Sequence, residues 1–495
     1  MQGFHLRKFK FEFAAAGAAF FILAIILLFR PITGVADNGD FARIMYSTGL
    51  FHLSEDIADR YFGFVNRLYG VGFVVPFGGG YISTQLPLVL LAVFISKSVL
   101  GTALFDIRFL AAIYILVLTV SIFFAARWGR KFAGFLGVVT ALSVIFIFCD
   151  IGYISYFNSL YGEPVTFVFL LLMAGMALTL AIEEKPAVWM LILFSAGAII
   201  FTGAKVQNSP TGLLAALLLI RLAWLRKDLV WRRISVVSAV LVLAVSLASF
   251  VSVSRDIKIC NKYQTVFYGI LRNSPDPAGD LEELGLDPSL SVLAGTNYFM
   301  EEYPIDIKAP EFKKMLYNKI SYTGVAAFYL RHPRRFLQKL EYAAENGFRL
   351  KQGFGNFEKY PGIQYKQQSN VFGFWSNFKL DVLPNSLIFV CAFYTLVLLV
   401  LIHEYIRAGD MTAGGNGSGI ARTRFFIEFM GAVTLMGIMQ FVLPVVGDGD
   451  ADLSKHLFLF NISFDMLFAA GLTYLSIKAA ALAHIFLKFY SFFFN

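Results

Sequence analysis

The chain has 495 residues, of which 58% are hydrophobic and 15% are charged, and its mean hydropathy is +0.67. This composition excludes an ordinary water-soluble protein, because a soluble fold of this size does not need so many long apolar runs. The net charge of +9 does not indicate a nucleic-acid-binding protein, since the basic residues form short clusters between apolar runs. The sequence therefore predicts an all-α polytopic membrane protein whose partner is a lipid bilayer and not a nucleic acid.

Ten apolar segments have about the length of a membrane-spanning helix, since about 20 residues rising ~1.5 Å each cross ~30 Å of hydrocarbon. We expect these helices at residues 13–29, 109–126, 132–150, 164–182, 187–202, 209–225, 234–253, 385–403, 423–444 and 457–477. The first segment also fits a signal peptide with Gly34-Val35-Ala36 as its cleavage site. A polytopic chain usually keeps its first helix as an anchor, and we favour that alternative.

Basic clusters set the predicted orientation, because lysine and arginine gather in cytoplasmic loops. The four clusters lie at residues 5–10, 127–131, 221–233 and 422–424. All four, and both termini, fall in the cytoplasm only if the further apolar segment 86–101 does not cross. This segment is short and carries Lys97, so we expect it to lie on the outer leaflet as an interfacial helix.

An acidic pair follows the first apolar segment, in the predicted outer loop 30–108. Asp37 and Asp40 stand in the run Ala36-Asp37-Asn38-Gly39-Asp40-Phe41-Ala42-Arg43. Two carboxylates at a membrane surface are costly unless water or a partner satisfies them. They suit a general base that deprotonates a hydroxyl, or a cation site. Asp-Asn-Gly is also a common turn sequence, so a solvated turn is the alternative.

Two later outer loops each carry a charged residue near a helix end. Glu163 stands before Pro164, where an acid either contacts a substrate or only complements the helix dipole. Lys205, followed by Gln207 and Asn208, is a lone cation at the predicted outer edge of the membrane. It suits a lipid phosphate, and the alternative is a snorkelling lysine that anchors a helix end.

More charge lies in the long outer segment 254–384 and in the last outer loop, 445–456. Arg331 begins a basic run that either steers an anionic substrate or is a solvated helix start. The last loop is first acidic and then basic, in the order Asp448, Asp450, Asp452, Lys455 and His456. Its carboxylates offer oxygen ligands to a hard cation, although their spacing matches no specific metal loop. The alternative is a solvated acidic loop whose last two residues contact phosphate.

The order of these parts resembles the GT-C superfamily of integral-membrane glycosyltransferases, such as the protein mannosyltransferases and the lipid A aminoarabinose transferases. Asp37 and Asp40 match the acidic motif of that family's first outer loop, and segment 86–101 matches an interfacial helix. Gly203-Ala204-Lys205, followed by Pro210, is similar to a Lys-Gly-type motif in a later outer loop.

The likeness covers roughly residues 10–230 and rests on loose motifs. Arg108, the basic turn Arg127–Lys131 and Glu163-Pro164 continue the family's pattern. The chain departs from it where Leu86-Pro87 stands in place of His-Pro-Pro. The two acids of the first loop are also three residues apart and not adjacent, so which of them is the base stays open.

The resemblance implies a GT-C-like fold with about ten transmembrane helices and an inverting transfer of a monosaccharide from a polyprenyl-phosphate donor. Asp40 or Asp37 would remove the acceptor's proton, with a preference for Asp40. We assign the donor phosphate to Lys205, Lys455, His456 and Arg331. We assign further substrate contacts to Arg43, Asn158, Glu163, Gln207, Asn208 and Asp450. No cofactor is expected with the exception of a divalent cation, for which Asp448 and Asp450 are candidates.

We expect three regions in the chain. Residues 1–253 form a transmembrane module, residues 254–384 form an extracytoplasmic segment that binds the acceptor, and residues 385–495 form the C-terminal helices. The acceptor would be a cell-envelope glycan, lipid or protein, and the site would face outward from a bacterial plasma membrane.

Two other functions remain open. A transporter or flippase of lipid-linked glycans predicts ionisable residues at mid-membrane, where Asp465 is the deepest acid. A non-catalytic envelope assembly protein that binds polyprenyl lipids would keep Lys205 but tolerate the loss of Asp37 and Asp40.

Overall fold

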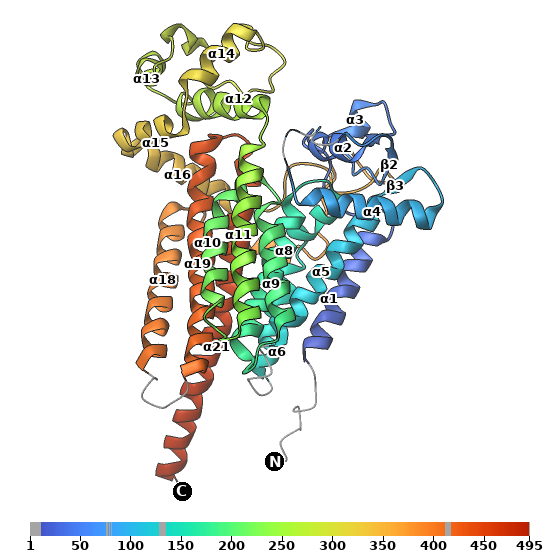
Figure 1. The fold of residues 1–495 in the computed structure, drawn as a ribbon. Helices are drawn as coiled ribbons and strands as arrows, with labels where there is room; N and C mark the ends of the chain where they lie inside the picture. The colour runs from blue at the N-terminus through green and yellow to red at the C-terminus, as the bar shows by residue number, and fades with distance from the viewer. Residues whose placement is uncertain are drawn as a thin grey trace.

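The computed structural model describes residues 11–75, 78, 80, 82–127, 135–410 and 417–494. These residues are mostly helical, and the long helices lie side by side in one bundle (Figure 1). The first described helix begins, and the last one ends, at the same end of this bundle. Short helices and loops cover the opposite end. The predicted polytopic helical architecture is therefore confirmed.

Every predicted spanning segment contains a helix, but not every helix has spanning length. Seven helices in the described residues are long and apolar enough to cross a membrane. They are α1 (Phe11–Leu28), α5 (Arg108–Ala126), α8 (Glu163–Ile182), α11 (Leu229–Val251), α18 (Leu387–Asp410), α19 (Gly417–Gly447) and α21 (Phe458–Phe494). Seven of the ten predicted membrane-spanning helices therefore have the length and composition to cross a membrane.

The other three predicted spans are broken or short. Helix α6 (Phe135–Phe148) is followed after a bend of 46° by α7 (Ile151–Ile154) and a 3-10 turn, Ser155–Asn158, and this pair counts as an eighth span if its parts are joined. Helices α9 (Val188–Thr202) and α10 (Gly212–Leu222) are short because a turn containing Pro210 separates them.

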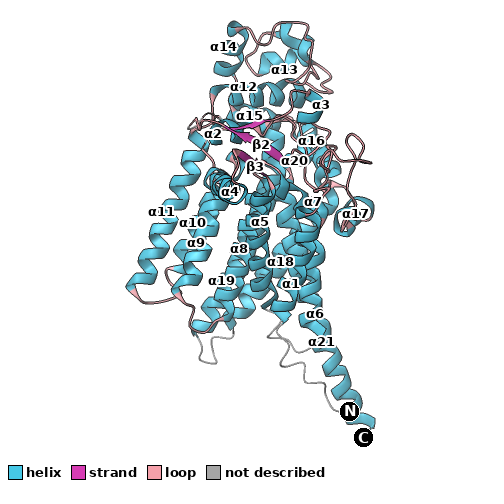
Figure 2. Ribbon diagram, turned by 90° about the vertical axis from the view of Figure 1, so that its right-hand side faces the viewer, coloured by secondary structure: helices cyan, strands magenta, loops and turns pink. Residues whose placement is uncertain are grey.

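The first outer loop contains a small sheet that the all-α prediction lacked. Its strands pair antiparallel in the order β1 (Leu50–His52), β2 (Leu68–Val71) and β3 (Leu104–Asp106). Strands of three or four residues are too short for alternation of polar and apolar residues to reveal them. The short helices α2 (Ala42–Thr48) and α3 (Ile57–Arg60) flank this sheet at the end of the bundle (Figure 2).

Helix α4 (Gln85–Leu100) corresponds to the segment that we expected not to cross the membrane. It lies across the end of the bundle, over α5 and α1, while the long helices run along the bundle (Figure 1). Its outward side is apolar and exposed, with Phe94 exposed by 70%. This orientation agrees with the predicted interfacial helix.

The long outer segment forms a lobe with its own hydrophobic core, which we call the cap lobe (residues 255–331). It contains α12 (Arg255–Tyr263), a π-helical stretch (Gln264–Ile270), α13 (Pro277–Glu283), a 3-10 turn (Pro288–Leu293), α14 (Pro310–Lys319) and α15 (Tyr322–Arg331). Its core includes Tyr263, Phe267, Phe312 and Phe328. Helix α16 (Pro333–Gly347) leads back to the bundle, and His332-Pro333 separates it from α15.

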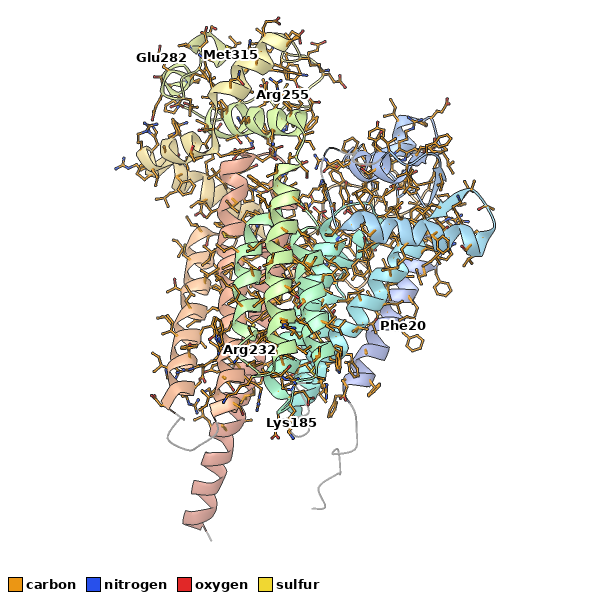
Figure 3. All side chains as sticks on the ribbon, viewed as in Figure 1. Phe20, Lys185, Arg232, Arg255, Glu282 and Met315 are labelled. Carbon is orange, nitrogen blue, oxygen red and sulfur yellow. The ribbon has the colours of Figure 1, made fainter. Side chains whose placement is uncertain are left out.

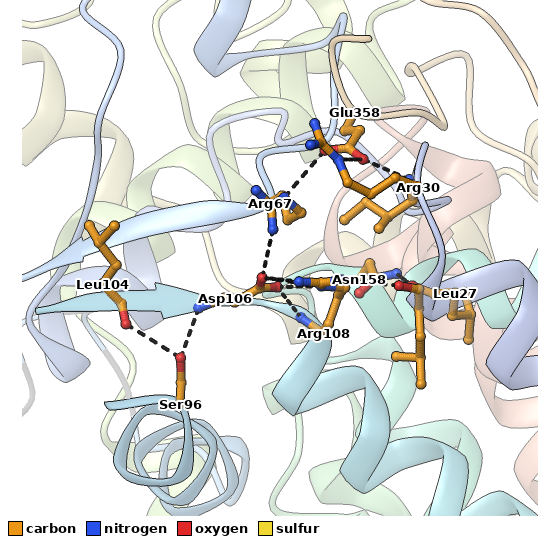
Figure 4. Close-up of polar contacts among 11 residues, drawn as sticks. Leu27, Arg30, Arg67, Ser96, Leu104, Asp106, Arg108, Asn158 and Glu358 are labelled. Atoms are coloured by element: carbon orange, nitrogen blue, oxygen red, sulfur yellow. Dashed lines mark hydrogen bonds and ion pairs between the residues drawn. The ribbon is translucent and has the colours of Figure 1, made fainter. Parts of the chain in front are cut away.

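After α16 the chain returns to the first outer loop, and ion pairs hold it there (Figure 4). Glu358 is 2.9 Å from Nε of Arg30 and 3.4 Å from Nε of Arg67. Asp106 continues the network, 2.9 Å from Arg67 and 2.7 Å from Arg108. A helix α17 (Phe374–Asp381) then precedes α18. The outer segment is therefore fastened to the first outer loop as well as to the C-terminal helices.

The charged loops separate to the two ends of the bundle. Lys185 and Arg232 lie toward the end where α1 begins, whereas Arg255 and Glu282 lie at the opposite end (Figure 3). Between these ends, apolar side chains such as Phe20 on α1 face outward. This arrangement suits helices surrounded by lipid with polar layers on both sides. The predicted basic turn 127–131 falls outside the described residues except for Arg127, which pairs with Glu183.

Candidate functional site

Five charged side chains from four separate parts of the chain meet at the end of the bundle that carries the cap lobe. We call this group the charged cluster, and it consists of Asp40, Arg43, Glu163, Lys205 and Lys455. Lys455, in the short helix α20 (Leu453–His456), forms an ion pair with Asp40. Arg43 lies 3.0 Å from the same carboxylate, and Lys205 lies 2.6 Å from Glu163. All five were predicted site residues, and the fold brings them together.

The turn that carries the two acids is built by its own side chains. Asp37 accepts hydrogen bonds through Oδ1 from the backbone N–H groups of Gly39 (2.7 Å) and Phe41 (3.1 Å). Gly39 has φ of +100°, which a residue with a side chain rarely adopts. The Tyr161 hydroxyl donates to the carbonyl oxygen of Ala36 at 3.0 Å. The Asp-Asn-Gly sequence is therefore a turn, as the alternative interpretation held, but it is a buried and anchored one.

The two acids of this turn have different surroundings. Burial alone would raise the pKa of Asp40, but the charges of Lys455 and Arg43 outweigh it and hold that pKa well below its usual value. Asp37 is 1% exposed, and its Oδ2 atom accepts no hydrogen bond from the described residues. The His52 Nε2 atom lies 3.4 Å from Oδ2. Asp40 is thus neutralised by protein cations, whereas the buried Oδ2 atom of Asp37 has no hydrogen-bond donor among the described residues.

Lys455 is the central cation of the cluster. Burial would lower its pKa, but the carboxylates of Asp40 and Glu163 outweigh burial and raise it, so the ammonium stays charged. Its Nζ atom lies 4.4 Å from the centre of the Tyr161 ring, which adds a cation–π contact. Its side chain is only 6% exposed. Such a charge is well shielded from water and interacts strongly with an anion that reaches it.

Glu163 and Lys205 form the second ion pair of the cluster. Glu163 opens α8 and is 1% exposed, and its Oε2 atom has no hydrogen-bond partner among the described residues. Glu163 is therefore held by the ion pair with Lys205 and not only by the dipole of α8. Lys205 reaches back to α8, and its side chain is 18% exposed, which argues against simple snorkelling to the membrane surface.

The last outer loop contacts the cluster through its basic end. His456 Nε2 lies 2.8 Å from Asp448, and the His456 carbonyl oxygen accepts a hydrogen bond of 2.5 Å from Gln207. Gln207 also donates to the Gln440 side chain at 2.9 Å. His456 and Gln207 therefore contact each other next to Lys455, and their predicted contacts with donor phosphate and substrate stay predictions.

The proposed cation site in this loop is not supported. Asp450 lies 2.8 Å from Lys339 and 3.5 Å from Arg272, and Asp448 pairs with His456. Burial raises the pKa of Asp448, which disfavours its charged form. The described residues contain no group of three or more His, Cys, Asp or Glu side chains that could hold a metal ion. Both aspartates are paired with basic side chains, which come from the cap lobe (Arg272), from α16 (Lys339) and from α20 (His456).

Three predicted site residues have other positions in the structure. Asn158 donates to the backbone carbonyls of Leu27 and Thr33, and Asn208 donates to Thr166 and to the carbonyl of Phe201. Both asparagines are buried and hold loops together. Arg331 is 58% exposed and pairs with Glu283 inside the cap lobe, so its described ion pair is separate from the charged cluster.

Sequence reasoning missed residues that only the fold places at the site. Tyr161 supports both the turn and Lys455, and Gln440 comes from the middle of a long apolar helix. His52 stands beside Asp37. A lone histidine, tyrosine or glutamine gives no spacing pattern, so the only available signal was the polar Gln440 within an apolar segment.

Comparison with known proteins places the chain in one family. Residues 5–484 match the family described as the YfdI N-terminal transmembrane domain, and the chain belongs to that family. No curated protein and no solved structure gives a significant match.

Proposed function

We propose that this protein is a glycosyltransferase that takes a monosaccharide from a polyprenyl-phosphate donor and passes it to a cell-envelope acceptor on the extracytoplasmic face. The observation that carries the proposal is the charged cluster, in which Lys455 and Lys205 lie beside the acidic turn of Asp37 and Asp40. Buried cations next to an available carboxylate are what this reaction needs. The GT-C resemblance of the sequence supports the same activity, and the family is one of transmembrane proteins.

The cations of the cluster suit the phosphate of the donor. Without substrate, Asp40 and Glu163 balance Lys455, Arg43 and Lys205, which leaves the five side chains with one net positive charge. A phosphate that enters the cluster gains from all three cations. As the bond between the anomeric carbon and the phosphate oxygen breaks, negative charge grows on that oxygen, and the same cations stabilise it.

The surroundings of the two acids favour Asp37 as the base, although the sequence favoured Asp40. Asp40 is held ionised by Lys455 and Arg43, and a carboxylate with a lowered pKa takes up a proton poorly. Asp37 presents Oδ2 without a hydrogen-bond donor. In the proposed reaction, the acceptor oxygen attacks the anomeric carbon from the face opposite the phosphate, its proton passes to Asp37, and the lipid phosphate leaves with inversion.

The flippase alternative receives less support from Asp465. This residue lies in α21 but is paired at 2.8 Å with Lys379 of α17, and it also accepts a hydrogen bond from the indole N–H of Trp375. Neither member of the pair is exposed. A neutralised and enclosed pair fits a structural contact better than a site on a transport path.

A transfer assay tests the proposal. The full chain in lipid nanodiscs is mixed with radiolabelled polyprenyl-phosphate sugars, one at a time, and with cell-envelope extract. We expect wild type to transfer label, Asp37→Asn to bind donor without transfer, and Lys455→Ala and Lys205→Ala to lose donor binding. Lys185→Ala, an exposed lysine at the opposite end of the bundle, is the control.

Three outcomes contradict parts of the proposal. Donor binding with no transfer by wild type, whichever sugar is supplied, overturns the enzyme and favours a flippase or an assembly protein. Transfer that survives Asp37→Asn but not Asp40→Asn returns the base to Asp40. Donor binding that is unchanged in both lysine variants moves the phosphate away from the charged cluster.

A further inference from the structure

A pocket opens beside Asp37, on the side of the first outer loop formed by α2, β1 and α3. Its lining residues are Asp37, Ala42, Met45, Tyr46, Leu50, Phe51, His52, Arg60 and Tyr61. The pocket shares Asp37's turn with the charged cluster, but neither Lys455 nor Lys205 lines it. Its described lining therefore differs from the charged cluster, and the two meet at the turn of Asp37 and Asp40.

Two buried polar atoms at this pocket have no hydrogen-bond partner among the described residues. They are Oδ2 of Asp37 and Nδ1 of His52. The Asp37 side chain is 1% exposed and the His52 side chain is 8% exposed. Buried polar atoms in folded proteins are nearly always satisfied by protein, water or ligand. The unsatisfied pair therefore indicates that something polar belongs in this pocket.

The charges of the lining restrict what that ligand is. The carboxylate of Asp37 repels an anion such as phosphate, while the Arg60 guanidinium repels a metal cation. A neutral hydroxyl group carries no charge and is repelled by neither group. It donates to Asp37 Oδ2, and its oxygen accepts from His52 Nδ1 when that nitrogen carries the proton; in the other tautomer a second hydroxyl donates to His52 Nδ1.

Aromatic rings supply the remaining walls. Tyr46 is 63% exposed and Phe51 is 51% exposed at the pocket, and the Tyr61 ring packs against His52 with 5.5 Å between ring centres. Phe51 lies opposite Gly70 in the paired strands, and a Cβ atom at Gly70 would come within 2.2 Å of the Phe51 ring. Aromatic faces beside a few convergent polar groups form the usual lining of a small-molecule site.

We propose that this pocket binds a neutral pyranose ring of the acceptor. Its hydroxyls meet Asp37 and His52, and its C–H face lies on the aromatic rings. His52 is then a positioning residue that holds the acceptor hydroxyl at Asp37. The inference rests on the proposed function, and it adds the chemical class of the acceptor and a place for it that the sequence did not reveal.

Saturation-transfer NMR tests the pocket without the donor. The full chain in nanodiscs is titrated separately with methyl glycosides of glucose, galactose, N-acetylglucosamine and rhamnose. We expect saturation transfer to at least one of them, lost in His52→Phe and in Tyr61→Ala. The signal should persist in Tyr61→Phe, which keeps the ring, and in Lys185→Ala, at the opposite end of the bundle. Thermal melting checks that each variant is folded.

The outcomes separate this inference from the proposed function. If no glycoside gives a signal, or if the signal is equal in folded His52→Phe, Tyr61→Ala and wild type, the pocket is not a sugar site. If the signal behaves as expected but no donor sugar is ever transferred, the pocket stands and the enzyme proposal fails. If label transfer occurs with the same rate in wild type and His52→Phe, His52 does not position the acceptor.

Discussion

Lys455 and Asp40 form an ion pair although 415 residues separate them in the chain. The contact joins the first outer loop to the loop before the last helix, so the charged cluster exists only when both ends of the chain have packed. Glu163 and Lys205, from the middle of the chain, complete it. Formation of the site is thereby coupled to folding of the whole bundle.

The ion pair of Asp40 should contribute to stability over the whole range from neutral to weakly acidic pH. Since the pKa of Asp40 is lowered in the folded state, its stabilisation is present above the unfolded value of about 3.9 and is lost only below it. We expect Asp40→Asn to lower the free energy of unfolding by about 1.5–3 kcal/mol. The difference in melting temperature from wild type should be the same at pH 7 and pH 5.

The same measurement tests the assignment of the base. If the difference in melting temperature between wild type and Asp40→Asn becomes smaller from pH 7 to pH 5, Asp40 takes up a proton in that range. Asp40 would then be poised as a general base, contrary to the charge balance around it. Arg43→Gln, which removes the more exposed of its two cations, is the matched control and should give a smaller loss.

Removing one partner of the buried pair Lys379–Asp465 should lower the free energy of unfolding strongly. Replacing both partners with apolar residues should lower it much less. Removing one partner leaves an uncompensated buried charge, so we expect Lys379→Met to cost about 3–5 kcal/mol. The double variant with Asp465→Leu should recover much of this loss. The melting temperatures of the single and the double variant, each compared with wild type, measure the loss and its recovery. Lys359→Met, which removes an exposed partner of Asp59, should cost no more than about 1 kcal/mol.

The loop before Lys455 depends on a close backbone contact. Gly449 has φ of +64°, and a Cβ atom there would lie 2.7 Å from the Cα atom of Gly269 in the cap lobe. We expect Gly449→Ala to destabilise the protein by at least about 1–2 kcal/mol, because the left-handed backbone is unfavourable to alanine. It should also lower label transfer by displacing Lys455. Gly447→Ala, with nothing within 4 Å, is the control and should have little effect.

The predicted orientation can be read from cysteine labelling in intact cells. In a variant without the three natural cysteines, Glu282→Cys should react with a membrane-impermeant maleimide added outside. Lys185→Cys should react only after the cells are opened, because it lies at the opposite end of the bundle. The reverse pattern would place the charged cluster in the cytoplasm and contradict an extracytoplasmic reaction.

The long apolar segments were predictable because each helix is specified by its own run of residues. A run of about 20 apolar residues needs only hydrocarbon around it and internal backbone hydrogen bonds, and neither depends on distant parts of the chain. The crosswise helix α4 was predictable from charge, because the basic clusters on both sides of it had to stay on one side of the membrane. The three-stranded sheet was not predictable, since its strands are held by partners as far apart as Leu68 and Asp106.

The sequence by itself determined that this is a helical membrane protein, and it identified the charged residues that carry the candidate site. The tertiary structure decided which of them meet, because an ion pair is selected by the positions of backbones that are distant in the chain. Asp448 and Asp450 looked like metal ligands until Lys339, Arg272 and His456 were placed beside them. The sequence favoured Asp40 slightly over Asp37 as the base, but in the structure Lys455 pairs with Asp40 and an oxygen of Asp37 has no donor among the described residues.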